Sequence, residues 1–125
     1  MDLEQTLRYI SDADDDTLFI LWTNADPVTA ELMVFMYAEN SVKYHKWNRI
    51  MIIIWGATAR LAAENDDIRA KIRHLSETGV CFSACITCAK ELGVEEKLMD
   101  LGVDLVKWLE PMTLVLKSNK KLITI

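Results

Sequence analysis

The chain has 125 residues, of which 51% are hydrophobic, which is the length and composition of one globular domain with a sizeable core. Its 14 Lys and Arg against 19 Asp and Glu give a formal net charge of −5, so it lacks the positive face with which proteins bind nucleic acids or anionic membrane surfaces. Because no run of about 20 apolar residues is present and the start MDLEQTLRYI lacks the regions of a signal peptide, we expect a cytoplasmic protein without a membrane partner.

The first 16 residues differ from the rest of the chain. Leu3, Leu7 and Ile10 recur at the spacing that lines one side of a short helix, and an acidic run follows at positions 12–16. A block of like charges is usually exposed to solvent. We therefore expect residues 1–16 to form an acidic N-terminal extension, ahead of a domain that spans residues 17–125.

The body of the chain alternates between strand and helix patterns. Expected strands lie at 17–23, 49–55, 80–84, 104–109 and 121–125. Helix patterns fall between them, and Asp26-Pro27 and Asn65 mark two of the helix starts. The first two strands are unbroken apolar runs, which indicates a sheet covered on both faces. The pattern predicts an α/β fold, a three-layer α/β/α domain with a five-stranded, mainly parallel sheet.

In a sheet of this kind, ligands bind at the carboxyl ends of the strands. Three expected loops meet at this edge, after the strands at 17–23, 49–55 and 80–84, and each leads into the N-terminus of a helix. The candidates for lining a pocket in these loops are Asn24, Trp55, Gly56, Thr58 and Thr87.

All three cysteines lie in one segment, CFSACITCAKELGV, at residues 81–94. Cys85 ends the third expected strand and precedes a helix, a position that favours the nucleophilic thiolate. Cys88 follows one helical turn later and completes a C-x-x-C pair, so we expect Cys85 and Cys88 to be the catalytic thiols. The alternative for both is a small buried side chain, the commonest state of a free cysteine. Cys81 lies about 13 Å from Cys85 along the strand and is expected in the core.

Metal and cofactor patterns are lacking in the sequence. A structural zinc site takes four ligands, whereas the chain has one C-x-x-C pair, and His45 and His74 fall at the far ends of helices. Neither G-x-G-x-x-G nor G-x-x-x-x-G-K-[ST], the patterns that bind phosphates, is present. We expect no metal and no bound cofactor.

The order of elements and the segments IIIWGATARLAAEN and CFSACITCAKELGV resemble the DsrE/DsrF-like family over residues 17–125. That family includes the sulfur-relay subunits of bacterial tRNA thiolation and of dissimilatory sulfur oxidation. In the subunit that carries sulfur, a cysteine ends the third strand and a Gly-Val pair follows eight residues on, as Gly93-Val94 follow Cys85 here. The resemblance implies that Cys85 is the sulfur carrier. Cys88 and residues 1–16 have no counterpart in the family pattern.

The resemblance also implies a homo-oligomer, a trimer or hexamer, and protein partners that deliver and accept persulfide sulfur. The leading hypothesis is a cytoplasmic sulfur carrier, or persulfide sulfurtransferase, that holds sulfane sulfur on Cys85 and passes it to a partner thiol. Two alternatives stay open at this point. One is a redox protein whose C-x-x-C pair cycles between dithiol and disulfide. The other is a non-catalytic oligomeric module that binds a ligand.

Overall fold

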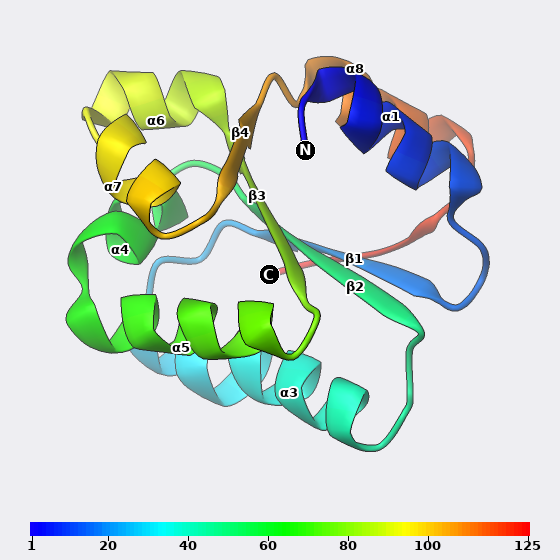
Figure 1. Ribbon diagram of the computed structural model, residues 1–125, viewed down its shortest axis with the longest axis horizontal. Coiled ribbons are helices and arrows are strands. Elements are labelled where there is room, and N and C mark those ends of the chain that lie inside the picture. The colour runs from blue at the N-terminus through cyan, green and yellow to red at the C-terminus, as the bar shows by residue number, and fades with distance from the viewer.

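A computed structural model describes all 125 residues of the chain. One sheet has the strand order β4-β3-β2-β1-β5, and each neighbouring pair is parallel. The strands are β1 (Thr17–Trp22), β2 (Arg49–Ile54), β3 (Cys81–Cys85), β4 (Asp104–Val106) and β5 (Lys121–Thr124). Helices cover both faces of the sheet (Figure 1), which confirms the expected three-layer α/β/α architecture.

The central strands are apolar throughout because both of their faces are covered. β1 and β2 pair in register, with Ile20 opposite Ile52 and Phe19 opposite Met51. Successive side chains point to opposite faces of a strand. Ile20 and Ile52 accordingly belong to one core cluster, whereas Phe19 and Met51 belong to a second cluster on the other side of the sheet.

The larger core cluster, of 24 buried residues, lies beneath the helices between β1 and β4. These helices are α2 (Pro27–Thr29), the π-helix η1 (Ala30–Phe35), α3 (Met36–Lys43), α4 (Thr58–Glu64), α5 (Asp66–Glu77), α6 (Ile86–Leu92) and α7 (Glu95–Asp100). Phe35 packs edge-on against Trp22 and Phe82, with ring centroids 5.2 and 6.4 Å apart. The three aromatic rings therefore link η1 to β1 and β3.

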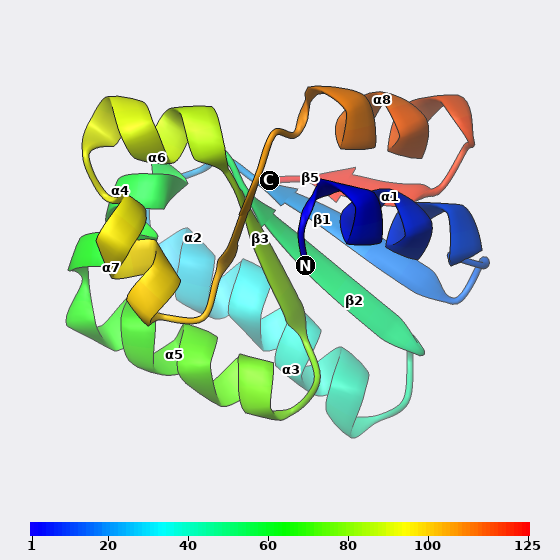
Figure 2. The ribbon, with the colours of Figure 1, turned by 45° about the horizontal axis from the view of Figure 1, so that its top comes forward.

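The opposite face is covered by α1 (Leu3–Asp12) and α8 (Leu109–Lys117), which pack side by side (Figure 2). Ile10 of α1 is fully buried in the second cluster, of nine residues, together with Phe19 and Trp108. The helix expected at the N-terminus is therefore present and packs within this chain. Asp14, Asp15 and Asp16, which follow it, are exposed.

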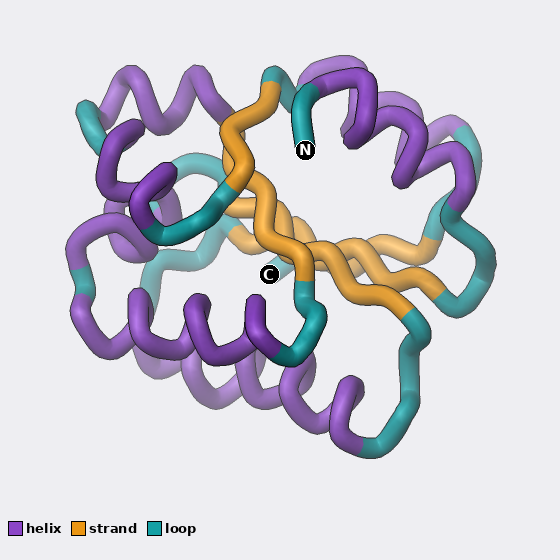
Figure 3. Tube along the Cα trace, viewed as in Figure 1, coloured by secondary structure: helices purple, strands orange, loops and turns teal.

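Figure 3 shows the five strands in orange. β1, β2 and β5 each end one residue earlier than expected, and β3 is shifted by one residue, to Cys81–Cys85. β4 ends at Val106 rather than at residue 109, because the chain turns there to bury Trp108, whose indole Nε1 donates a hydrogen bond to Ser83 Oγ at 2.9 Å. None of the helices is both long and apolar enough to cross a membrane.

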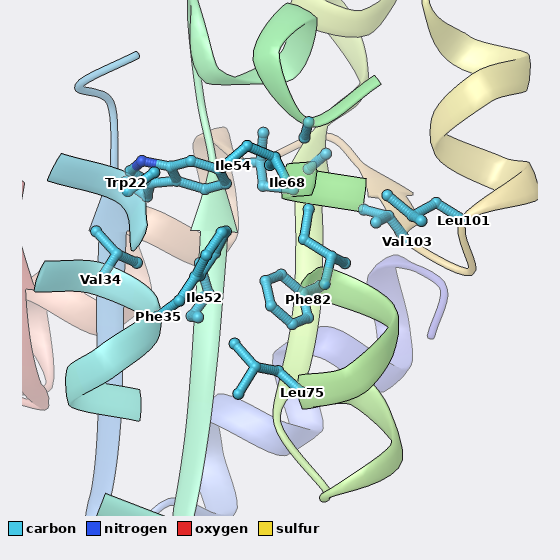
Figure 4. Close-up of a cluster of buried hydrophobic side chains, with 14 of the residues drawn as sticks. Trp22, Val34, Phe35, Ile52, Ile54, Ile68, Leu75, Phe82, Leu101 and Val103 are labelled. Atoms are coloured by element: carbon cyan, nitrogen blue, oxygen red, sulfur yellow. The ribbon is translucent and has the colours of Figure 1, made fainter. Parts of the chain in front are cut away.

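The close-up in Figure 4 shows the larger cluster from within. Trp22 and Ile54 lie at the last residues of their strands, and Phe82 lies on β3. The ends of β1 and β2 are thus anchored by buried side chains, directly before the loops that lead into α2 and α4. This anchoring gives the candidate site a rigid base.

Candidate functional site

A cavity of about 820 Å³ lies between α4 and α6, where the chain leaves the carboxyl ends of β1, β2 and β3. Its lining residues are Ala25, Gly56, Ala57, Arg60, Leu61, Glu64, Asn65, Thr87, Cys88, Glu91 and Leu92. This is the edge at which ligands bind in parallel α/β sheets. Apolar side chains from both helices form part of the wall, and the exposed side chains of Arg60, Glu64 and Glu91 add charge to it.

Two of the five expected pocket residues, Gly56 and Thr87, border this cavity. The side chain of Asn24 instead shapes its own loop, accepting the N–H of Asp26 at 2.9 Å. Trp55 packs against the second core cluster, on the other side of the sheet. Asn24, Trp55 and Thr58 thus lie outside the lining.

Thr58 does not line the cavity but holds the loop that borders it. Its buried hydroxyl donates to the carbonyl of Trp22 at 2.7 Å and accepts the N–H of Trp55 at 3.2 Å. These bonds tie the end of β1 to the loop after β2 and hold that loop in a fixed conformation. Gly56, the next residue of the loop, has φ +73°, a left-handed conformation that favours glycine.

The two cysteines of the C-x-x-C pair differ in access. Cys85 ends β3 and is only 6% exposed, and it is not among the lining residues. Cys88 lies in the first turn of α6 and borders the cavity, where its Sγ accepts the N–H of Gly56 at 3.3 Å. The sulfur that borders this cavity is therefore that of Cys88, whereas the resemblance implies Cys85 as the sulfur carrier. β3 ends within the covered sheet, and the following helical turn carries the chain out to the cavity.

The surroundings of Cys88 act on its ionisation in opposite directions. Burial raises the pKa of the Cys88 thiol, the Gly56 N–H opposes this by stabilising the thiolate, and the neighbouring Cys85 thiol adds to the rise. Cys85 immediately precedes α6 and Cys88 lies in its first turn, so the two thiols are close neighbours at the start of one helix.

Cys81 occupies a separate environment at the start of β3. It is half-buried against the second core cluster and lies beside Tyr9 of α1. Burial raises the pKa of Cys81, and the charge of Asp104 adds to this, whereas Tyr9 and Arg49 oppose it. All three cysteines are free thiols.

The histidines lie away from the cysteine pair. His45 borders a second cavity of about 310 Å³, together with Asp16 and Thr78 near the amino ends of the strands. His74 Nε2 lies 3.5 Å from a carboxylate oxygen of Glu39. The structure brings no three or more His, Cys, Asp or Glu side chains together in a group that could hold a metal ion.

Sequence reasoning missed the walls of the cavity. Ala57, which immediately precedes α4, and Leu61 and Glu64 on α4 recur every three or four residues, and on α6 Cys88 and Leu92 do the same. Such spacing places residues on one face of a helix. Because both helices follow neighbouring strands, this shared face was the signal that could have identified the walls.

Comparison with known proteins agrees with the fold. The model of the DsrE/DsrF-like family matches residues 18–124. A solved structure of a conserved protein of unknown function from Bacteroides thetaiotaomicron is similar to this chain, with 33% sequence identity and a TM-score of 0.87, over 91% of this chain and 100% of that one. No curated protein matches the chain. The match over nearly the whole sheet confirms the resemblance that the cysteine segment indicates, and the chain belongs to the DsrE/DsrF-like family.

Proposed function

We propose that this protein is a sulfur carrier, which takes a sulfane sulfur as a persulfide at the Cys85/Cys88 pair and passes it to the thiol of a partner protein. The observation that carries the proposal is the contact of Cys88 Sγ with the Gly56 N–H at 3.3 Å, at the wall of the cavity. The family includes sulfur-relay subunits, and its pattern assigns the carried sulfur to Cys85.

The proposed chemistry exchanges one S–S bond for another. A thiolate of the pair attacks the outer sulfur of a donor persulfide, R–S–SH, and a new S–S bond forms to the cysteine. The S–S bond of the donor breaks, and the donor leaves as the thiolate R–S⁻. Delivery to an acceptor thiol repeats the same exchange in the other direction, so neither step needs an oxidant or a reductant.

The cavity suits this exchange. Leu61 and Leu92 contribute apolar wall, which limits the water around a bound persulfide, whereas an open side lets the donor and acceptor approach. Free thiols persist in reducing compartments, so we place the protein in the cytoplasm. The proposal includes a protein donor, a protein acceptor and a homo-oligomer, a trimer or hexamer, all implied by the family resemblance.

A dithiol redox protein is the second candidate, and the proximity of Cys85 and Cys88 at the start of α6 favours it. In that case the pair would be oxidised by exchange with the disulfide of a partner, which is itself reduced to a dithiol, and an external thiol would reduce the pair again. This candidate predicts a different mass change at the same pair of residues.

Intact mass spectrometry after incubation with inorganic polysulfide tests both candidates. We expect a gain of about 32 Da, the mass of one sulfur atom, that dithiothreitol removes. A loss of about 2 Da would indicate the disulfide and support the redox protein. The matched control is the double variant Cys85→Ser/Cys88→Ser, which keeps Cys81. An equal gain in that control, or no mass change in the parent protein, contradicts the proposal.

A further inference from the structure

We propose that the two cysteines act in sequence: Cys88 receives the sulfur at the cavity, and Cys85, buried behind it, stores it. This inference rests on the proposed function and adds the order in which the thiols act. It gives Cys88 a role in a position for which the family pattern has no counterpart.

The first step follows from access. A donor persulfide that enters the cavity meets Cys88, which borders it, before Cys85, which is 6% exposed and does not line it. The rate of sulfur exchange depends on access to the attacking thiolate as well as on its concentration. Cys88 is therefore the thiol that an incoming donor can reach.

The Gly56 N–H strengthens this assignment. It donates to Cys88 Sγ at 3.3 Å, and a hydrogen bond to sulfur stabilises the thiolate, which is the nucleophilic form. The loop that presents it is held by the bond from the Trp55 N–H to Thr58 Oγ1, at 3.2 Å. Gly56 is thus a positioning residue, which acts on the sulfur of the incoming persulfide only through Cys88.

The second step moves the sulfur inward. The Cys85 thiolate attacks the outer sulfur of the Cys88 persulfide, and a bond forms between this sulfur and Cys85 Sγ. The bond from the outer sulfur to Cys88 Sγ breaks, and Cys88 leaves as a thiolate, which takes up the proton that Cys85 released. The two thiols are neighbours at the start of α6, three residues apart, so the transfer needs no large movement. One sulfur atom changes place, and no electrons are lost or gained.

Storage at Cys85 has a consequence for release. A persulfide at a 6% exposed position is shielded from small thiols in solution, whereas one on Cys88 is open to the cavity. The sulfur must return to Cys88 before an acceptor can take it. Cys88 therefore governs both loading and delivery, and Cys85 governs the lifetime of the stored sulfur.

The test uses glutathione persulfide as the donor and the variant Cys81→Ser as the parent, so that Cys85 and Cys88 are the remaining thiols. Samples are quenched with iodoacetamide at increasing times, and peptide fragmentation locates the persulfide. We expect sulfur on Cys88 first and on Cys85 later. Adding Cys88→Ser should slow the loading of Cys85 by about tenfold or more, because access controls the exchange rate.

Adding Cys85→Ser should still allow loading of sulfur on Cys88 and make the loss of that sulfur to added glutathione about tenfold faster. If this variant fails to fold, Cys85→Ala serves the same purpose, with circular dichroism as the check of folding for each protein. The order of loading in the parent does not depend on either substitution.

Three outcomes would overturn the relay and leave the proposed function standing: parental loading in the Cys88→Ser protein, sulfur on Cys85 from the earliest time, or a persulfide that never leaves Cys88. A disulfide formed with release of HS⁻ would also overturn it, because Cys85 would then attack Cys88 Sγ rather than the outer sulfur. Absence of sulfur from both cysteines would contradict the carrier function itself.

Discussion

The two ends of β3 hold cysteines in different settings. At the amino end, Cys81 is half-buried beneath α1 and lies beside Tyr9. At the carboxyl end, Cys85 and Cys88 are neighbours at the start of α6, and Cys88 borders a cavity of about 820 Å³. Burial raises the pKa of both Cys81 and Cys88. A perturbed pKa therefore does not separate the two ends, and what distinguishes Cys88 is the cavity and the N–H on its sulfur.

Cys81 and Cys88 also pack against different core clusters, on opposite sides of the sheet. Cys81 packs against the second core cluster, beneath α1 and α8, whereas Cys88 packs against the larger cluster on the other side of the sheet. A change in one cluster should therefore act mainly on its own cysteine. Three predictions test this separation, in order of expected effect on stability.

The largest effect is expected for Trp108→Ala. Trp108 is 1% exposed within the second cluster, and its indole Nε1 donates to Ser83 Oγ on β3 at 2.9 Å. Truncating a buried tryptophan costs about 3–5 kcal/mol, so the free energy of unfolding should fall by this amount in urea denaturation. Alkylation of Cys81 should accelerate more than that of Cys88, because the cluster beside Cys81 is opened.

Trp108→Phe is the matched variant, since it keeps an aromatic ring but removes the hydrogen-bond donor. We expect a smaller loss of stability, of about 1–3 kcal/mol, from the lost hydrogen bond to Ser83 Oγ and the smaller ring. Site-resolved alkylation with iodoacetamide in native buffer is the measurement for both proteins. Equal acceleration at Cys81 and Cys88 would show that the two ends of β3 are not separate.

Most of the fold could be predicted from the sequence because its signals are local. The apolar runs predicted β1 and β2 to within a residue, and the helix expected directly after Cys85 is α6 (Ile86–Leu92). β4 was predicted to extend to residue 109 because the residues after Val106 continue its pattern, but in the structure these residues leave the sheet. Trp108 is the residue responsible, and its partner Ser83 lies on another element, which no local pattern reveals.

The candidate site was predictable in place but not in detail. The C-x-x-C pair and Gly56 follow from the strand-to-helix boundaries. Which sulfur faces the cavity depends on the position of α4, which comes from a separate segment of the chain. The group that donates a hydrogen bond to Cys88 Sγ is the backbone N–H of Gly56, and a backbone group cannot be recognised from the type of residue. Trp55 was expected at the pocket, although strand alternation already places it with Met51 and Ile53, on the opposite face.

A smaller effect on stability is expected for Gly56→Ala, with Gly102→Ala as its matched control. The two glycines have φ +73° and +84°, and an added Cβ would meet no atom within 4 Å at either position. Both substitutions should therefore cost about 1–2 kcal/mol, the strain of a left-handed conformation with a side chain. Any shift of the backbone at Gly56 also moves its N–H, which donates the hydrogen bond to Cys88 Sγ.

We expect Gly56→Ala alone to slow the alkylation of Cys88 at neutral pH, because a weaker N–H contact stabilises less thiolate. The readout is the alkylation rate as a function of pH, which separates a change in pKa from a change in access. Should both glycine variants alter Cys88 equally, the hydrogen bond would have no specific part in its reactivity, and strain in the fold would explain the change.

The smallest effect is expected from alkaline pH in the unmodified protein. The pKa values of Cys81, Cys88 and Tyr9 are all raised in the folded chain, each first of all by burial. The native state therefore keeps protons that the unfolded chain has already released, so stability falls as pH rises. The loss should begin near the ordinary pKa of cysteine, about 8.5, and continue as tyrosine begins to ionise at about 10 in the unfolded chain.

The urea midpoint, measured from about pH 7 to about pH 10, should decrease over this window. Cys81→Ser and Cys88→Ser should each flatten the decrease, because each removes one thiol whose pKa burial raises. An unchanged slope in one of the two variants would mean that the thiol at that end of β3 does not hold its proton more tightly in the folded chain.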